Sequence, residues 1–169
     1  PSVSKKRRWV DNLGLTLFNS IVLQVVFGAA VVGTALYAER EGVGAVRLLD
    51  VPVWAQVVLA VVVMDFILYV WHLLNHKVPL LWRFHRVHHA DLNMDVSTAT
   101  RFHIGELAPS AVIKIGFVYL LGATVTAVVI FESLIVLCAQ FHHSSLRVPE
   151  SFERLYWLFF VPPSMHRIH

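Results

Sequence analysis

The sequence predicts an all-α, integral-membrane helical bundle of about four membrane helices or half-helices, with a small helical cap that carries histidine motifs. Hydrophobic residues make up 57% of the 169 residues and charged residues 15%, and the mean hydropathy is +0.65, too apolar for an ordinary soluble domain. Long apolar stretches recur along the chain. All ten histidines lie in the last hundred residues, mostly at spacings of three and four that share one helix face.

The first apolar stretch covers about residues 13–38. At about 1.5 Å per residue it can cross a hydrocarbon core of about 30 Å. A signal peptide is the competing interpretation, because the basic residues Lys5, Lys6, Arg7 and Arg8 precede it. The apolar run is too long for a typical signal core, and no clean small-residue cleavage site follows. We therefore expect a membrane helix.

The remaining elements follow from breaks in the apolar pattern. A polar connection leads to a second membrane segment at about residues 53–76, which Pro79 ends. We expect a cap over about residues 77–106, with an amphipathic helix near 80–90. The next apolar stretch is too long for one straight crossing, and Gly122 predicts a hairpin of two segments, 107–122 and 123–141. Residues 142–169 complete the cap, with a short helix near 152–160.

The length suits a single domain over residues 1–169. Because the chain opens on Pro1 and stops at His169 inside a motif, we expect it to be truncated at both ends. The single cysteine, Cys138, excludes an internal disulfide and a cysteine-based zinc site. The basic N-terminal run favours contact with membrane lipid over nucleic acid. No Gly-rich dinucleotide fingerprint is present.

Charge placement predicts the topology. The basic run at residues 5–8 assigns the N-terminus to the cytoplasmic side of a multi-pass membrane protein. Two crossings and a hairpin then bring residues 72–101 and 143–169 to that same side. This prediction uses only the positions of the basic residues and not those of the histidines. It nevertheless places every histidine on the cytoplasmic face.

The histidine motifs predict a metal centre. Imidazole is a common ligand for iron, zinc and copper. So many ligands imply two ions, and nitrogen donors with open positions suit iron and dioxygen, although ligand type alone leaves copper open. Of the adjacent pair His142 and His143, only one can point cleanly inward. The candidate ligands are His72, His76, His85, His88, His89, His103, His143, His166 and His169.

Three further residues are candidates for supporting the ligands. Asp65 and Tyr69 share a helical stripe with His72 and His76. Asp65 either orients a ligand imidazole or pairs with an arginine, or it forms a polar contact between helices. Glu106 follows His103 by three residues and is a candidate acceptor for that ring.

The motifs together resemble the fatty acid hydroxylase / sterol desaturase superfamily of integral-membrane, histidine-box di-iron oxygenases. The resemblance covers nearly the whole chain and is strongest from Asp65 to His169, in DFILYVWHLLNHKVPLLWRFHRVHHADLNMDVSTATRFHIGE, FHHSSLRVP and VPPSMHRIH. It implies a four-helix membrane base below a cytosolic cap, with two iron ions between them.

The resemblance also assigns the histidines to boxes. It gives the first box to His72 and His76, and the second to His85, His88 and His89. His103 matches the histidine of an Arg-aromatic-His-x-x-Glu segment, His143 that of a His-Ser-Asn segment, and His166 and His169 the final HxxHH. Ser145 replaces the usual Asn, and the last histidine of the final box falls one position past the end.

The function that follows is an oxygen-dependent lipid hydroxylase or desaturase acting on C–H bonds of a sterol, fatty acyl or related lipid. Each turnover needs electrons from an external, NAD(P)H-linked donor, through a b-type cytochrome, ferredoxin or rubredoxin. The alternative is a non-catalytic metal-binding or metal-transport membrane protein. Transporters usually hold their ligands at mid-span, whereas these histidines lie at helix ends and in the cap, which favours the enzyme.

Overall fold

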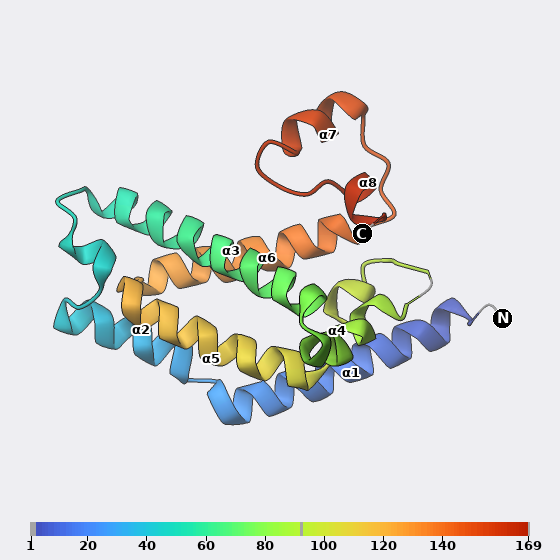
Figure 1. Ribbon diagram of the computed structural model, residues 1–169, viewed down its shortest axis with the longest axis horizontal. Helices are drawn as coiled ribbons and strands as arrows, with labels where there is room; N and C mark the ends of the chain where they lie inside the picture. The colour runs from blue at the N-terminus through green and yellow to red at the C-terminus, as the bar shows by residue number, and fades with distance from the viewer. Residues whose placement is uncertain (1–2, 92, 169) are drawn as a thin grey trace.

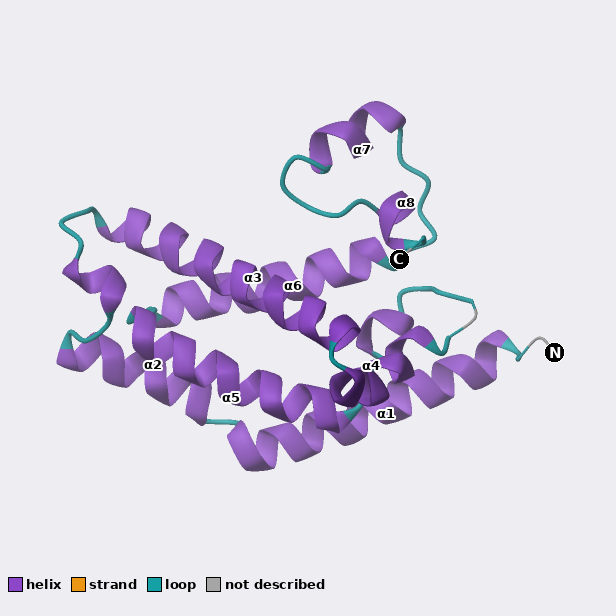
Figure 2. Cartoon of the chain, in the orientation of Figure 1, coloured by secondary structure: helices purple, strands orange, loops and turns teal. Residues whose placement is uncertain are grey.

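The computed structural model describes residues 3–91 and 93–168, and these residues form helices and loops without strands (Figures 1 and 2). Four helical segments are long and apolar enough to cross a membrane. The predicted all-α membrane bundle is confirmed. The elements are α1 Lys5–Phe27, α2 Ala30–Glu41, η1 Ala45–Leu48, α3 Val53–Lys77, α4 Pro79–His89, η2 Thr98–Thr100, α5 Ile104–Leu121, α6 Val125–His142, α7 Glu150–Tyr156 and α8 Pro163–His166.

The N-terminal part of the bundle differs from the single stretch that the sequence predicted over residues 13–38. Helix α1 begins at Lys5, where the Ser4 hydroxyl accepts a hydrogen bond from the Arg7 backbone N–H at 3.3 Å. The basic run therefore lies inside the first turns of the helix. The helix then breaks after Phe27, and α2 starts at Ala30. Gly28, a weak helix former, lies at the break.

A sharp turn separates α3 from α4. The backbone of Val78 is extended, as expected for a residue before proline, and Pro79 occupies the first turn of α4, where its missing N–H costs nothing. The sequence predicted this break and both helices to within a residue or two. The turn matters for the site because it folds α4 back beside the end of α3.

The predicted reversal at Gly122 is present. Gly122 has φ +70°, and its N–H bonds back to the last turn of α5, so the helix ends there. Thr124 caps α6 by accepting from the Ala127 N–H at 3.0 Å. Gly44 (φ +116°) packs directly on Gly122, and neither position has space for a Cβ.

Small side chains form much of the bundle core. Ala35 and Ala127 are fully buried, and Ala60 and Met64 of α3 pack in the same cluster. Small residues let membrane helices approach closely, which favours packing where lipid removes the hydrophobic drive. Large apolar side chains such as Val25 and Phe66 point outward instead, as expected for a surface in contact with lipid.

Both parts of the cap lie at one end of the bundle. In Figure 1, α4 and α8 lie toward the end of the bundle where α1 begins, and α7 projects above them, while the η1 loop and the turn between α5 and α6 lie at the other end. Helix α7 covers Glu150–Tyr156, a shorter segment than the predicted 152–160. Every described histidine therefore lies toward the same end of the bundle.

Candidate metal centre

The first group of histidines is built by the turn between α3 and α4. His72 and His76 lie one turn apart at the end of α3, and α4 folds back to bring His85 against them. The Nε2 atoms of His72 and His76 are 3.2 Å apart, and those of His76 and His85 are 3.1 Å apart. His89 extends the group, with its Nε2 3.1 Å from that of His85. We call His72, His76 and His85 the first triad.

The second group joins three segments that are distant in sequence. His88 comes from α4, His143 caps the end of α6, and His166 lies in α8. The Nε2 of His143 is 3.1 Å from that of His88 and 3.0 Å from that of His166. We call these residues the second triad.

Helix α4 links the two triads. His85 belongs to the first triad, and His89, one turn along, lies beside it. His88 belongs to the second triad. The rings of His85 and His88 stack at 5.6 Å between centroids, so the triads are immediate neighbours. The HxxHH motif thus serves two sites from one helix, because a shift of one residue rotates the side chain by about 100°.

In His88 and His143, the hydrogen-bond partner of Nδ1 determines that Nε2 faces into the triad. His143 Nδ1 is 2.7 Å from the Ala139 carbonyl oxygen, and His88 Nδ1 is 3.3 Å from that of Arg101. A carbonyl oxygen only accepts, so each Nδ1 carries the proton. Burial, reinforced by neighbouring imidazoles and first by His143, lowers the pKa of His88 to about 2. Burial also lowers the pKa of His143.

Both rings are therefore neutral at pH 7. Their Nε2 atoms, each with a lone pair, face each other and are only 3.1 Å apart. Two lone pairs cannot form a hydrogen bond, but a cation between them turns the repulsion into two favourable contacts. Two nitrogens bound at right angles to one metal at about 2.1 Å lie about 3.0 Å apart. The donor set and its spacing fit a transition-metal ion, and imidazole nitrogens suit iron, zinc, copper and nickel.

Glu106 supports the first triad. It is 5% exposed, and its Oε1 accepts a hydrogen bond from His85 Nδ1 at 2.9 Å. This contact turns the Nε2 lone pair of His85 toward His76. The sequence placed Glu106 beside His103, but the carboxylate reaches His85 because α4 packs on the first turn of α5.

The other sequence-predicted residues lie outside the two triads. His103 caps α5 by accepting from the Gly105 N–H at 2.9 Å, and its metal role stays a prediction. His169 lies outside the described residues. Of the adjacent pair, His143 joins the triad and His142 does not, so one ring points inward as expected.

The structure leaves the supporting roles of Asp65 and Tyr69 as predictions. Both side chains are exposed on the surface of α3, and Tyr69 packs against Phe66 with 6.3 Å between ring centroids. The carboxylate of Asp65 makes no hydrogen bond or ion pair with the residues that the structure describes.

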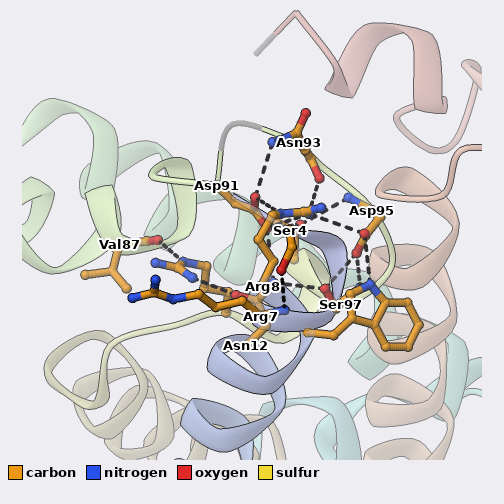
Figure 3. A network of polar contacts seen from close by, with 12 residues as sticks. Ser4, Arg7, Arg8, Asn12, Val87, Asp91, Asn93, Asp95 and Ser97 are labelled. Atoms are coloured by element: carbon orange, nitrogen blue, oxygen red, sulfur yellow. Dashed lines mark hydrogen bonds and ion pairs between the residues drawn. The ribbon is translucent and has the colours of Figure 1, made fainter. Parts of the chain in front are cut away.

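Sequence reasoning missed a polar stripe on α1 that contacts the segment after α4. Arg8, Asn12, Thr16 and Asn19 recur at spacings of four, four and three, so they share one helix face. They bond to the segment between α4 and α5, which carries the backbone partner of His88. Figure 3 shows the contacts of Arg8 and Asn12. The spacing of polar residues within an apolar helix was the signal that could have found it.

A small cavity lies between α3, α5 and α6. It is lined by apolar side chains such as Leu68, Ile113 and Phe131. At one end it reaches Trp71, which directly precedes His72, and Ser110, one turn along α5 from Glu106. Lys114 also lines the cavity and pairs with Glu132 of α6 at 2.5 Å.

The chain is similar to known lipid hydroxylases. It is 28% identical to rat (Rattus norvegicus) cholesterol 25-hydroxylase over 159 residues, covering 92% of this chain and 50% of that protein. It is 33% identical to the human (Homo sapiens) cholesterol 25-hydroxylase over 92 residues, covering 54% of this chain and 34% of the other. It is 44% identical to ornithine lipid hydroxylase OlsE of Rhizobium tropici over 73 residues, covering 43% and 22%.

The chain thus spans half or less of the length of these relatives. No solved structure matches it. The fatty acid hydroxylase family matches residues 57–169, from the second turn of α3 onward, and this range includes both histidine triads. On this match over most of its length, the chain belongs to the fatty acid hydroxylase family.

Proposed function

We propose that this chain is the metal-binding core of an oxygen-dependent lipid hydroxylase that holds two iron ions, one at each triad. The observation that carries the proposal is the lone-pair contact between His88 and His143, beside a second group of inward-facing imidazoles. Family membership supports oxidative lipid chemistry at these histidines.

Bound irons would supply dioxygen activation and C–H oxidation. The residues of the chain hold and orient the ligands: Glu106 fixes His85, and two backbone carbonyls fix His88 and His143. Hydroxylation by this route consumes one O₂, two electrons and two protons, and it releases the hydroxylated lipid and one water. The electrons come from an external, NAD(P)H-linked electron-transfer protein, which is a b-type cytochrome, ferredoxin or rubredoxin.

The substrate is an apolar lipid segment that enters from the membrane. Family membership and the apolar surface that the helices present to lipid support this. The matched relatives are named as sterol and ornithine-lipid hydroxylases, which favours hydroxylation over desaturation. The basic run at the start of α1 supports a cytoplasmic position for the histidines.

The alternative is a membrane protein that binds or transports metal without catalysis. A transporter is expected to hold its ion near the middle of the bilayer, between two halves of a broken helix. Both triads instead draw on helix ends and on the cap, which supports an enzyme that meets its substrate at the membrane surface.

The test compares the lipids of a host that expresses the protein with an electron-donor chain. Under ¹⁸O₂ we expect a lipid heavier by one ¹⁸O atom with the wild type and with Arg86→Ala, an exposed control on α4. His88→Ala removes a ligand of the second triad and should abolish this product. Iron analysis of the purified protein accompanies the lipid measurement.

Two results contradict the proposal. If the wild type and His88→Ala give the same lipids, the histidine centre does not oxidise lipid. If reconstituted vesicles show metal flux while no oxygen enters any lipid, the transport alternative is correct.

A further inference from the structure

Helix α1 contributes no residue to either triad. Its polar stripe, however, forms hydrogen bonds to the segment between α4 and α5, which contacts His88. Arg8, Asn12 and Asn19 are buried although they lie in one of the apolar helical segments. A buried polar group costs free energy unless it is hydrogen-bonded. Each of these side chains bonds to the segment between α4 and α5. Figure 3 shows the contacts of Arg8 and Asn12.

Arg8 fixes the start of that segment. Its Nε and Nη2 donate to the two carboxylate oxygens of Asp91 at 2.6 and 2.9 Å, and Nη2 also reaches the Asn93 carbonyl and Asp95. A two-point contact of this kind defines orientation as well as distance. Trp9 adds a bond from its indole N–H to Asp95 at 3.0 Å.

Asn12 links the start of the segment to its end. Its side chain is fully buried, and its Nδ2 lies 3.1 Å from Asp91 Oδ2 and 2.9 Å from Ser97 Oγ. Its Oδ1 accepts from Arg101 Nη1 at 2.6 Å. Both polar atoms of the amide are therefore used, each toward a different part of the segment.

Arg101 transmits this arrangement to His88. Its Nε donates to the Val87 carbonyl at 2.8 Å, so the guanidinium is held between α1 and α4. Its own carbonyl accepts from His88 Nδ1. The next residue, Phe102, stacks on the His88 ring at 4.6 Å with an interplanar angle of 8°. The position of Arg101 therefore determines both the tautomer and the plane of that imidazole.

The first triad has a different support. His85 is oriented by Glu106 of α5, and His72 and His76 are carried by α3. Loss of the contact between α1 and residues 91–102 should therefore affect the two triads unequally.

We propose that Asn12 is a positioning residue for the second triad, and that it acts through Arg101 to hold His88 with its Nε2 lone pair toward His143 and His166. The proposal rests on the proposed function only for the identity of the ion. The orientation of His88 is a property of the polypeptide and can be measured without metal.

The first measurement is metal content. Asn12→Leu keeps the approximate size of the side chain but removes both polar groups. We expect about two irons per chain in the wild type and about one in Asn12→Leu, with affinity at the second site lower by roughly 10- to 100-fold. Asp11→Asn, at the exposed neighbouring position on α1, should keep about two.

The second measurement uses metal-free protein in lipid nanodiscs. The ¹⁵N NMR signals of His88, assigned by their loss in His88→Gln, should report a proton on Nδ1 in the wild type. They should report a mixture of tautomers in Asn12→Leu. If the wild type binds no metal, the proposed function fails, but this measurement still decides the role of Asn12.

A second variant tests the link through Arg101. Arg101→Met keeps an unbranched apolar stem but removes the guanidinium that bridges Asn12 and the Val87 carbonyl. It should reproduce both effects of Asn12→Leu, a mixture of His88 tautomers and the loss of the second ion. Three results overturn the proposal: an unchanged His88 tautomer in Asn12→Leu, equal loss of both ions, or wild-type behaviour of Arg101→Met.

Discussion

At the scale of single residues, the partner of one ring nitrogen decides what the other nitrogen can bind. Glu106 accepts from His85, and backbone carbonyls of Arg101 and Ala139 accept from His88 and His143. In each case the acceptor holds a proton on Nδ1 and leaves a lone pair on Nε2. These contacts, and not the sequence spacing alone, leave the Nε2 lone pairs available to a metal ion.

We expect Glu106→Gln to weaken metal binding at the first triad by roughly 10- to 100-fold. The amide can donate as well as accept, so it no longer enforces a proton on His85 Nδ1. Competition with a chelator of known affinity measures the change. Glu39→Gln, an exposed substitution on α2, is the matched control and should bind metal like the wild type. Equal affinities for Glu106→Gln and the control would contradict the role of the carboxylate.

Asp95 predicts a pH dependence of the α1 contact. Burial alone raises the pKa of Asp95, but hydrogen bonds from Ser97 and Trp9 and the charge of Arg8 outweigh it, so the pKa lies below its usual 3.8. A carboxylate whose pKa is lower in the folded state stabilises the fold at every pH above its unfolded-state pKa. This contribution is lost as the pH falls through the folded-state pKa.

The indole N–H signal of Trp9 should therefore titrate with a midpoint below 3.8, because its acceptor is the Asp95 carboxylate. NMR of the protein in nanodiscs measures this. The titration should be absent in Asp95→Asn and at Trp54, an exposed indole at the start of α3. A midpoint at or above 3.8 would be inconsistent with the hydrogen bonds described.

At the scale of elements, two close approaches determine how the helices meet. At the cap end, the turn at Val78 and Pro79 folds α4 back onto α3 and so creates the first triad. At the other end, the Gly122 turn between α5 and α6 packs on Gly44 beside η1. The turn reverses the chain, so α6 returns His143 toward the cap, where it meets His88.

We expect Gly122→Ala to destabilise the protein by about 1–3 kcal/mol, because its φ is +70° and a Cβ would meet the Val43 carbonyl. Gly116→Ala is the control, since the space beside Gly116 is open and alanine favours a helix. The free energy of unfolding in mixed detergent measures both. Similar values for the two variants would show that the Gly44–Gly122 contact is not tight.

At the scale of the whole molecule, the charged and polar parts separate to the two ends of an apolar bundle. The histidines and the cap lie at the end where α1 begins, and the η1 loop lies at the other. Aliphatic and aromatic side chains, such as those of Val25, Phe66 and Leu137, cover the surface between the two ends. In the proposed function, this separation would let the site meet a lipid from the bilayer and an electron-transfer protein from the aqueous side.

The separation predicts opposite accessibility for two introduced cysteines. In a Cys138→Ser background, Asp50→Cys should react with a membrane-impermeant maleimide in intact cells, because the η1 loop faces outward in the predicted topology. Ser151→Cys on α7 should react only after the membrane is opened. Labelling of Ser151→Cys in intact cells would reverse the assignment of the cytoplasmic side.

Some features could be predicted from the sequence because they depend on local patterns. Apolar length predicted the membrane bundle, and Pro79 and Gly122 predicted the two turns, since each restricts the backbone at its own position. The spacing of the histidines predicted that they would gather, because helix geometry places i, i+3 and i+4 on one face, and their role as metal ligands stays a prediction. The break near Gly28 was missed, since the hydropathy of the stretch does not change there.

The tertiary structure decided how the histidines divide into two triads and which groups orient their rings. The spacing grouped His85, His88 and His89 together, but packing sends His88 to a different triad, which His143 and His166 complete. Packing also gives Glu106 a contact with His85, where the sequence suggested His103. It brings Asn12 into contact with Arg101, 89 positions away in the sequence. Local rules fix the backbone of each helix, whereas the partner of a buried polar group depends on which distant segment lies within hydrogen-bonding distance.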